Sequence, residues 1–462
     1  MERAALAAEA YVYGYPLVRD LSVVEDFMHT GFGPLPPAPF NHFAHAGRAA
    51  PPGAPLMSVD DDTVRSLAHL DLSGGPVLLH VPGAEGEDDT DGAGGAGGAD
   101  CVLQFVDAWT NNFAYVGRRA TGTRAGEWLV APPGWAGDVP DGVLGVIDAP
   151  TSVVSVIGRD ASRAVDDSDD SEEPERGRAL RAQLGVTYVE PGTHRTGLPA
   201  PDPDVPEPLR FFEQLRVWMA DFPPSARDQA YQDRFQPLGL LEEGPSPYTR
   251  ADPALVRALT EGLARGRAWV EEEAGRAAAG RGGWVMDPHL YDYNLDHYGV
   301  GTIDSPEWRI ADREASYRTR AVAARCSLWG VHGYEAVYAH TFRDAGGERL
   351  NGAGSYVLRF DGRPPPVEAS WSLAVYDATG QRLVGTPGTR RRPVGDRTPG
   401  LVHGEDGSLT VHLRRERPED PVAAANWLPV PDGDFRLVLR LCAPGPEILD
   451  GTYEIPAVER IR

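Results

Sequence analysis

The stretch 102–117, VLQFVDAWTNNFAYVG, decides the fold class of this 462-residue chain. It holds two short apolar runs, and similar runs recur between 59 and 157, where glycine or proline turns separate them. Such runs between such turns are typical of antiparallel sheets. The sequence therefore predicts a first β unit here. Its runs are PVLLHVP at 76–82, VLQFVDAW at 102–109, FAYVG at 113–117, EWLVAP at 127–132 and SVVSVIGR at 152–159.

Apolar residues at helical spacing occur on both sides of this unit. The segment 1–30 has one apolar face and predicts a helix, which Gly14 and Pro16 should break or kink. The segments 209–222 and 253–275 also carry the helical period, so a helical connector is expected in mid-chain. The face of the first helix consists of Leu6, Tyr13, Leu17, Leu21 and Val24.

A second β unit is predicted in the C-terminal third, after one more helix at 313–330. The expected fold is α+β and mainly β, with two antiparallel β-sandwich units joined by the helical connector. The expected domains are 1–176, 177–311 and 312–462. The strand-like runs of the second unit are SYVLRF at 355–360, SWSLAVYD at 370–377, SLTVHLRR at 408–415 and FRLVLRLCAP at 435–444.

The composition narrows the classes of function. The 53 glycines and 42 prolines together make up about a fifth of the 462 residues, whereas average usage of the two is roughly 12%. This excess favours a turn-rich protein. The formal net charge of −24 repels phosphate backbones and anionic membranes, so no nucleic-acid or membrane partner is predicted. The chain has no lysine, which excludes a pyridoxal Schiff base, a lysine aldolase and a Walker-type phosphate loop.

Cysteine usage and hydropathy predict a cytoplasmic protein. Cys101, Cys326 and Cys442 are too few and too far apart for a disulfide framework or a thiolate zinc site. No run of 18 apolar residues occurs, and Glu2 and Glu9 interrupt the stretch where a signal peptide would be apolar. We therefore expect a soluble protein in a reducing compartment.

The first candidate for catalysis is the acidic turn that contains Asp60, Asp61 and Asp62. Neighbouring carboxylates raise each other's pKa, so Asp60 and Asp62 are predicted to form a general acid/base pair. A hard cation is a further possibility. The alternative is a helix N-cap in an exposed turn.

The second candidate is the strand that contains Trp109 and Asn111, which alternation places on one face with Asp107. These groups predict a wet cleft that binds substrate. Arg118 and Arg320 are predicted to hold an anionic or hydroxylated substrate, although Arg118 could instead pair with the acidic turn.

The third candidate lies in the C-terminal unit, where tryptophans flank proline-rich turns. Trp371, Asn426 and Trp427 are predicted to line a pocket for a sugar or an aromatic ligand. The alternative is that the tryptophans only close the edge of a β-sandwich.

The segment 287–299, DPHLYDYNLDHYG, gathers five residues that could bind a metal. Their spacing fits neither a zinc helix nor a calcium loop, so an ordinary polar loop is expected and no metal site is predicted. No Gly-x-Ser-x-Gly elbow occurs, which gives a serine hydrolase no support. The five residues are Asp287, His289, Asp292, Asp296 and His297.

Eight segments spread along nearly the whole chain carry a resemblance to a known family: 10–18, 60–77, 107–122, 131–135, 317–324, 354–377, 406–413 and 426–444. In this order they resemble bacterial proteins that join the domain of unknown function numbered 1254 to the one numbered 1214. The resemblance implies two β-rich units, the second like a jelly roll, joined by helices. It implies no general activity. The family's usual Asn-x-Asp-Thr turn falls on 60–63, where this chain has aspartate in place of the asparagine.

These observations lead to two main hypotheses about function. The first is a cofactor-independent hydrolase or lyase that acts on a small polar or carbohydrate-like molecule through carboxylate acid/base chemistry. The second is a non-catalytic protein in which the same residues bind a ligand or hold the sandwiches together. A metal-dependent oxygenase would need two histidines and a carboxylate in one cavity, which only 287–297 could offer. The sequence leaves a divalent metal and a homo-oligomer as open alternatives.

Overall fold

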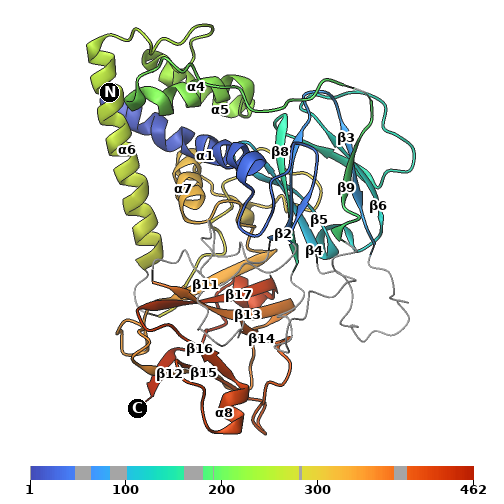
Figure 1. Ribbon diagram of the computed structural model, residues 1–462, viewed down its shortest axis with the longest axis vertical. Helices are drawn as coiled ribbons and strands as arrows, with labels where there is room; N and C mark the ends of the chain where they lie inside the picture. Colours follow the sequence, from blue (N-terminus) through green and yellow to red (C-terminus); the bar gives the residue numbers. More distant parts are fainter. Residues whose placement is uncertain are drawn as a thin grey trace.

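A computed structural model of the chain has three parts, a helical layer flanked by one β unit at its side and another at its end (Figure 1). Helix accounts for 29% and strand for 26% of the residues that the structure describes, so the predicted α+β class is confirmed, with more helix than the strand-rich sequence suggests. The structure describes residues 2–46, 64–83, 101–160, 181–190, 192–279, 283–378 and 393–461.

The first β unit contains a five-stranded and a four-stranded sheet whose apolar faces share one core. All strand pairs are antiparallel except β6 with β7, so the second sheet is mixed. Because β9 pairs with β3, this unit draws on residues beyond 176. In spatial order the sheets are β1 (Ala44–His45), β2 (Val64–Asp71), β8 (Val153–Asp160), β4 (Cys101–Asp107) and β5 (Asn112–Val116), then β7 (Gly145–Asp148), β6 (Gly126–Ala131), β3 (Val77–Val81) and β9 (Gly185–Tyr188).

The second β unit repeats this plan, with five strands in one sheet and four in the other. All four predicted runs form strands, and β15 with β16 is again a parallel pair. The jelly-roll likeness stays a prediction. In spatial order the sheets are β10 (Val285–Met286), β11 (Ala336–Thr341), β17 (Phe435–Pro444), β13 (Val367–Asp377) and β14 (Val394–Gly395), then β16 (Trp427–Pro429), β15 (Leu409–Arg414), β12 (Ser355–Phe360) and β18 (Val458–Ile461).

The helical layer is built on α1, which the predicted break does not interrupt. The helix continues through Gly14 and Pro16, and both residues are buried. A side chain at position 14 would lie 2.4 Å from Leu215, so the glycine allows α1 to approach α4 closely. The described helices are α1 (Arg3–Thr30), α2 (Arg118–Thr121), η1 (Glu207–Leu209), α4 (Arg210–Asp221), α5 (Ala226–Gln232), η2 (Asp233–Leu238), α6 (Pro253–Ala279), η3 (Pro306–Trp308), α7 (Arg313–Cys326), α8 (Pro421–Ala425) and α9 (Pro446–Leu449).

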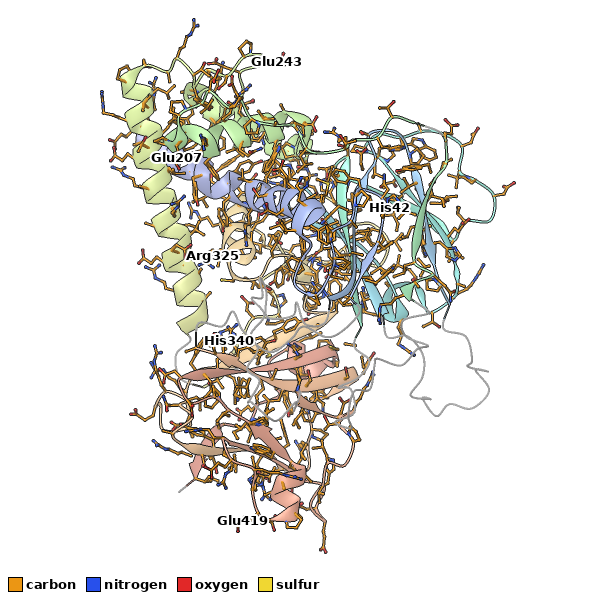
Figure 2. The ribbon with its side chains drawn as sticks, in the orientation of Figure 1. His42, Glu207, Glu243, Arg325, His340 and Glu419 are labelled. Atoms are coloured by element: carbon orange, nitrogen blue, oxygen red, sulfur yellow. The ribbon has the colours of Figure 1, made fainter. Side chains whose placement is uncertain are left out.

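Small residues bring α6 and α1 together. At Gly262 and Gly266 a side chain would lie 2.3 Å from Ala7 and 2.7 Å from Tyr11. Arg325 of α7, labelled in Figure 2, donates two hydrogen bonds to Glu271 of α6 and so joins these two helices. This packing fixes the face of α7 that meets the first β unit. In the part of the chain that the structure describes, no helix is long and apolar enough to cross a membrane.

Candidate functional site

A polar pocket lies where the first β unit meets the helical layer. Its free space is about 380 Å³ including the open mouth, of which about 10 Å³ admits the centre of a water molecule. Five segments supply its walls: β4 and the turn after it, residues 150–151 before β8, residues 223–228 at the start of α5, the loop at 293–297 and one face of α7. The lining residues are Asp107, Trp109, Asn111, Pro150, Thr151, Pro223, Pro224, Ser225, Asp228, Tyr293, Asn294, Leu295, Asp296, His297, Arg313, Ser316, Tyr317 and Arg320.

The turn after β4 holds Asp107 rigidly at the pocket wall. One carboxylate oxygen accepts hydrogen bonds from the backbone N–H of Trp109 at 2.9 Å and of Asn111 at 2.8 Å. The other accepts from the Asn111 side-chain amide at 3.0 Å. Between them Thr110 has φ of 67°, a left-handed conformation that a β-branched residue rarely adopts. Such strain is found where the surrounding structure fixes a particular geometry, and it makes this turn a candidate functional element.

Asp107 is buried, and burial raises the pKa of its carboxyl. The charge of His297, the hydrogen bonds from Asn111 and the charge of Arg320 act in the opposite direction and lower that pKa. A carboxyl group in a cleft is a candidate for proton transfer when burial and specific neighbouring charges shift its pKa.

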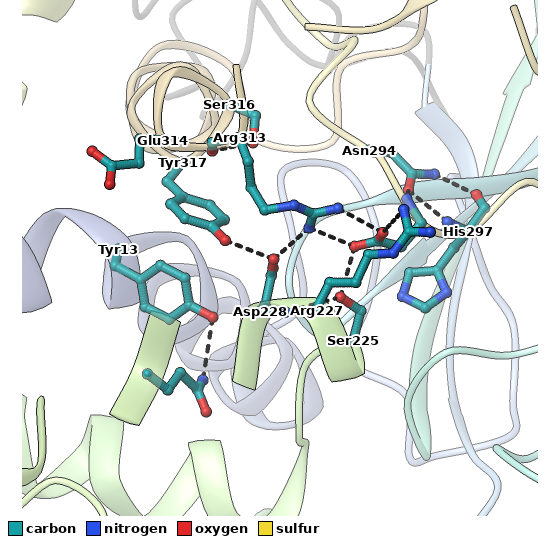
Figure 3. A network of polar contacts seen from close by, with 12 residues as sticks. Tyr13, Ser225, Arg227, Asp228, Asn294, His297, Arg313, Glu314, Ser316 and Tyr317 are labelled. Carbon is teal, nitrogen blue, oxygen red and sulfur yellow. Dashed lines mark hydrogen bonds and ion pairs between the residues drawn. The ribbon is translucent and has the colours of Figure 1, made fainter. Parts of the chain in front are cut away.

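An ion-pair network around Arg313 forms another wall (Figure 3). Its guanidinium donates to Asp228 at 2.5 Å and to both oxygens of Asp296 at 2.7 Å. Ser225 donates a hydrogen bond to Asp296 at 2.6 Å, and Tyr317 donates one to Asp228 at 2.7 Å. Burial would raise the pKa of Asp296, but the hydrogen bonds from Arg313 and Ser225 outweigh it and lower that pKa. The Asp296 carboxylate is therefore held ionised, and the hydrogen bonds fix both carboxylates in place.

Arg320 is the least satisfied charge of the pocket. It is 3% exposed, and its guanidinium carbon lies 5.3 to 5.6 Å from the ring centres of Tyr13, Trp109 and Tyr317. Among the residues that the structure describes, its Nε and Nη2 are buried without a hydrogen-bond partner. Arg313, Ser316, Tyr317 and Arg320 follow the helical period, which is why one face of α7 carries them all.

Three of the predicted binding residues meet in this pocket: Trp109, Asn111 and Arg320. Trp109 is buried and its indole N–H donates to the carbonyl of Phe222 at 2.8 Å. Arg118 is an exposed residue of α2, and it is not among the described residues that line the pocket. The predicted pair Asp60 and Asp62 lies outside the described residues.

The C-terminal candidates lie elsewhere, in the core of the second β unit. Trp371 packs on Phe360 with ring centres 5.2 Å apart. Asn426 exchanges two hydrogen bonds with the backbone of residue 402, and Trp427 donates to the carbonyl of Arg414 at 2.7 Å. All three are buried, none belongs to the described lining of the pocket, and these contacts hold strands and turns together.

The segment 287–299 divides between two places. Asp296 and His297 enter the pocket, whereas His289 pairs with Asp292 at 2.6 Å. Within the described ranges no three His, Cys, Asp or Glu residues are placed to hold a metal ion. Among the pocket residues that sequence reasoning missed are Ser225, Asp228 and Arg313. The available signals were the double proline before Ser225 and the i, i+7 spacing of Arg313 and Arg320.

The fold and pocket define a two-unit α+β protein, and the comparisons give its family. One family model, described as "Protein of unknown function (DUF1254)", matches residues 40–187, and another, "Protein of unknown function (DUF1214)", matches 335–446. The chain therefore belongs to the family of proteins that join these two domains. The pocket takes five lining residues from the first match and the rest from the region between the two.

One solved structure supports the fold. The VPA0106 protein from Vibrio parahaemolyticus is 20% identical in sequence, with a TM-score of 0.67 and full coverage of both chains. An uncharacterised protein from Burkholderia cenocepacia is 10% identical, with a TM-score of 0.43, covering 98% of this chain and 89% of its own. No curated protein matches the chain.

Proposed function

We propose that this protein is a hydrolase or lyase that acts on a small polar molecule in the pocket, using carboxylate acid/base chemistry without an organic cofactor. One observation carries the proposal: Asp107 is a buried pocket carboxylate fixed by three hydrogen bonds from its own turn. A group that exchanges protons with a substrate needs a fixed position and a pKa moved toward neutrality, and burial moves the pKa of Asp107 in that direction.

In this proposal Asp107 and His297 exchange protons with the substrate. Their electrostatic interaction and their shared pocket support the pairing, since two titratable groups in different environments can take the roles of acid and base. Asn111 orients the Asp107 carboxylate, and Trp109 supplies an apolar wall. Asp60 and Asp62 stay the sequence-based alternative for the acid/base pair.

The second candidate function is binding without chemistry. Its support is the network in which Arg313 already pairs with both Asp228 and Asp296, as a pocket scaffold would require. In that case the pocket would recognise a ligand, and neither Asp107 nor His297 would transfer a proton. A cytoplasmic location and a homo-oligomer also stay predictions.

A substrate screen with matched variants tests the proposal. The native protein is incubated with a panel of small esters, amides, lactones and hydroxy acids, and products are followed by NMR. For any compound turned over, Asp107→Asn should lower kcat by about 100-fold or more, because general acid/base catalysis contributes about 10²–10⁴. Asp361→Asn, an exposed substitution in the second unit, is the control and should leave kcat unchanged.

The variants must first be shown to fold, by near-UV circular dichroism. A kcat of Asp107→Asn within twofold of the native value would remove Asp107 from the chemistry. Asp60→Asn and Asp62→Asn would then show whether the acidic turn carries the reaction. Binding by both forms without turnover of any compound would favour the second candidate function.

A further inference from the structure

We propose that Arg320 binds the carboxylate of a small monoanionic ligand through its Nε and Nη2 atoms. The inference deepens the proposed function and rests on it in one respect, namely that the bound molecule is also the substrate. Binding itself can be measured without turnover, so the two claims can fail separately.

The unpartnered atoms of Arg320 form one edge of its guanidinium. Nε and Nη2 carry parallel N–H groups whose spacing matches the two oxygens of a carboxylate. Both atoms are buried, and no residue in the described part of the chain accepts a hydrogen bond from them. Buried donors without a partner are rare and costly in native proteins, so this edge has the chemistry of a site that a ligand completes.

Two other arginines of the chain show what fills the same edge. In Arg216, Nε and Nη2 donate to the two carboxylate oxygens of Glu213 at 2.9 and 2.8 Å. In Arg325, on the same helix as Arg320, the same atoms donate to Glu271 at 2.7 and 2.8 Å. Among the residues that the structure describes, none supplies such a carboxylate to Nε and Nη2 of Arg320.

Asp107, whose carboxyl interacts electrostatically with Arg320, makes its hydrogen bonds elsewhere. The two carboxylate oxygens of Asp107 accept hydrogen bonds from Trp109 and Asn111. Asp107 and Arg320 both lie in segments that the structure describes, and no hydrogen bond joins them. The rings of Tyr13 and Tyr317 hold the guanidinium in place by cation–π contact, which leaves its edge free to donate. The cation is therefore positioned but not neutralised by a hydrogen-bonded anion.

The surroundings select a small monoanion. The empty volume of the pocket is about 380 Å³ including its open mouth, which limits the ligand to a small molecule. Asp228 and Asp296 line the same pocket and would repel a second negative charge. A carboxylate carries one charge in the planar form that the arginine edge matches, whereas a phosphate dianion carries two.

Titration of the whole protein with small anions tests the inference. Acetate, propionate and inorganic phosphate are added to the native protein and to Arg320→Met, and affinity is measured by calorimetry and by ligand-observed NMR. Propionate or acetate should bind the native protein, and Arg320→Met should bind it about 10- to 100-fold more weakly, since hydrogen bonds to a charged group contribute about 1.5–3 kcal/mol. Phosphate should bind neither form.

Two further variants keep the test decisive. Arg320→Lys retains the charge but has no planar edge, so it should also weaken carboxylate binding, and it replaces Arg320→Met if that variant does not fold. Arg359→Met, which removes an exposed arginine of the second unit, should bind as the native protein does.

The outcomes separate the two claims. Equal carboxylate affinity in native protein and both Arg320 variants, or binding of phosphate alone, would overturn the inference. Carboxylate binding that depends on Arg320, with no turnover of any carboxylate compound, would leave the inference standing and count against the proposed enzyme.

Discussion

The two β units have the same plan of sheets but use similar residues differently. Trp109 in the first unit and Trp427 in the second both donate an indole hydrogen bond to a backbone carbonyl. The acceptor of Trp109 is Phe222, in the helical layer, whereas that of Trp427 is Arg414, a nearby residue of its own sheet. One tryptophan therefore joins two parts of the molecule, and the other closes its own unit.

The asparagines differ in the same way. Asn111 orients a buried carboxylate at the pocket, while Asn426 ties its own turn to the backbone of residue 402. The two regions differ because different parts of the molecule pack against each β unit. Charged and aromatic residues of α5 and α7 face the turn after β4, whereas the core of the second unit is closed by its own apolar side chains. A shared sheet plan thus gives a polar pocket only where the helices meet it.

The largest expected effect breaks the second unit alone. Trp371→Ala should lower the free energy of unfolding by about 3–5 kcal/mol, because it leaves a cavity in an apolar core. The measurement is urea unfolding followed by circular dichroism, with Trp371→Phe as a milder control. Carboxylate binding at Arg320 should survive below the unfolding transition. Loss of that binding in folded Trp371→Ala would show that the second unit contributes to the pocket.

A somewhat smaller effect is expected at the pocket network. Arg313→Met leaves the carboxylates of Asp228 and Asp296 partly buried without their cation, and should cost about 3 kcal/mol of unfolding free energy. Arg359→Met in the second unit removes an exposed pair with Asp361 and should change stability by about 0.5 kcal/mol or less. Equal effects of the two variants in urea unfolding would contradict the proposed difference between the regions.

The smallest effect concerns the segment between the units. Burial raises the pKa of Asp292 to about 6, its pair with His289 opposing the rise, and its Oδ1 has no hydrogen-bond partner among the described residues. Because the folded-state pKa of Asp292 lies above the unfolded value of 3.8, the folded protein holds this proton more tightly than the unfolded chain does. This carboxyl therefore contributes stability at low pH that is lost as the pH rises from about 4 to 6.

Asp292→Asn removes this titration. Its unfolding free energy relative to the native protein should rise with pH between 4 and 6, by at most about 1.4 kcal/mol per pH unit. Parallel pH profiles of the two proteins, measured by thermal unfolding, would show that Asp292 does not titrate in this range. Asp434→Asn, on the surface of the second unit, is the matched control and should leave the profile unchanged.

Much of the fold can be read from local patterns. The strand-like runs quoted for the two units all form strands, and the helices α4, α6 and α7 fall where the apolar periods predict them, because a period of two or of about 3.6 reflects one buried face. Other strands, such as β9 and β11, were not predicted. The predicted break at Pro16 does not occur, since the helix continues through it. Its propensity cost of about 3 kcal/mol is outweighed by burial of α1 against its neighbours.

The site was only partly predictable. The sequence by itself brought Asp107, Trp109 and Asn111 together, because residues so close in the chain meet whatever the rest of the fold does. It was wrong in placing them on one face of a strand, since β4 ends at Asp107 and the other two lie in the turn before β5. Only the tertiary structure decided that Arg313 reaches Asp228, 85 residues away, and that Arg320 rather than Trp371 or Trp427 joins the pocket. Local periodicity specifies which face of an element is buried, but the partner of that face depends on the packing of the whole chain.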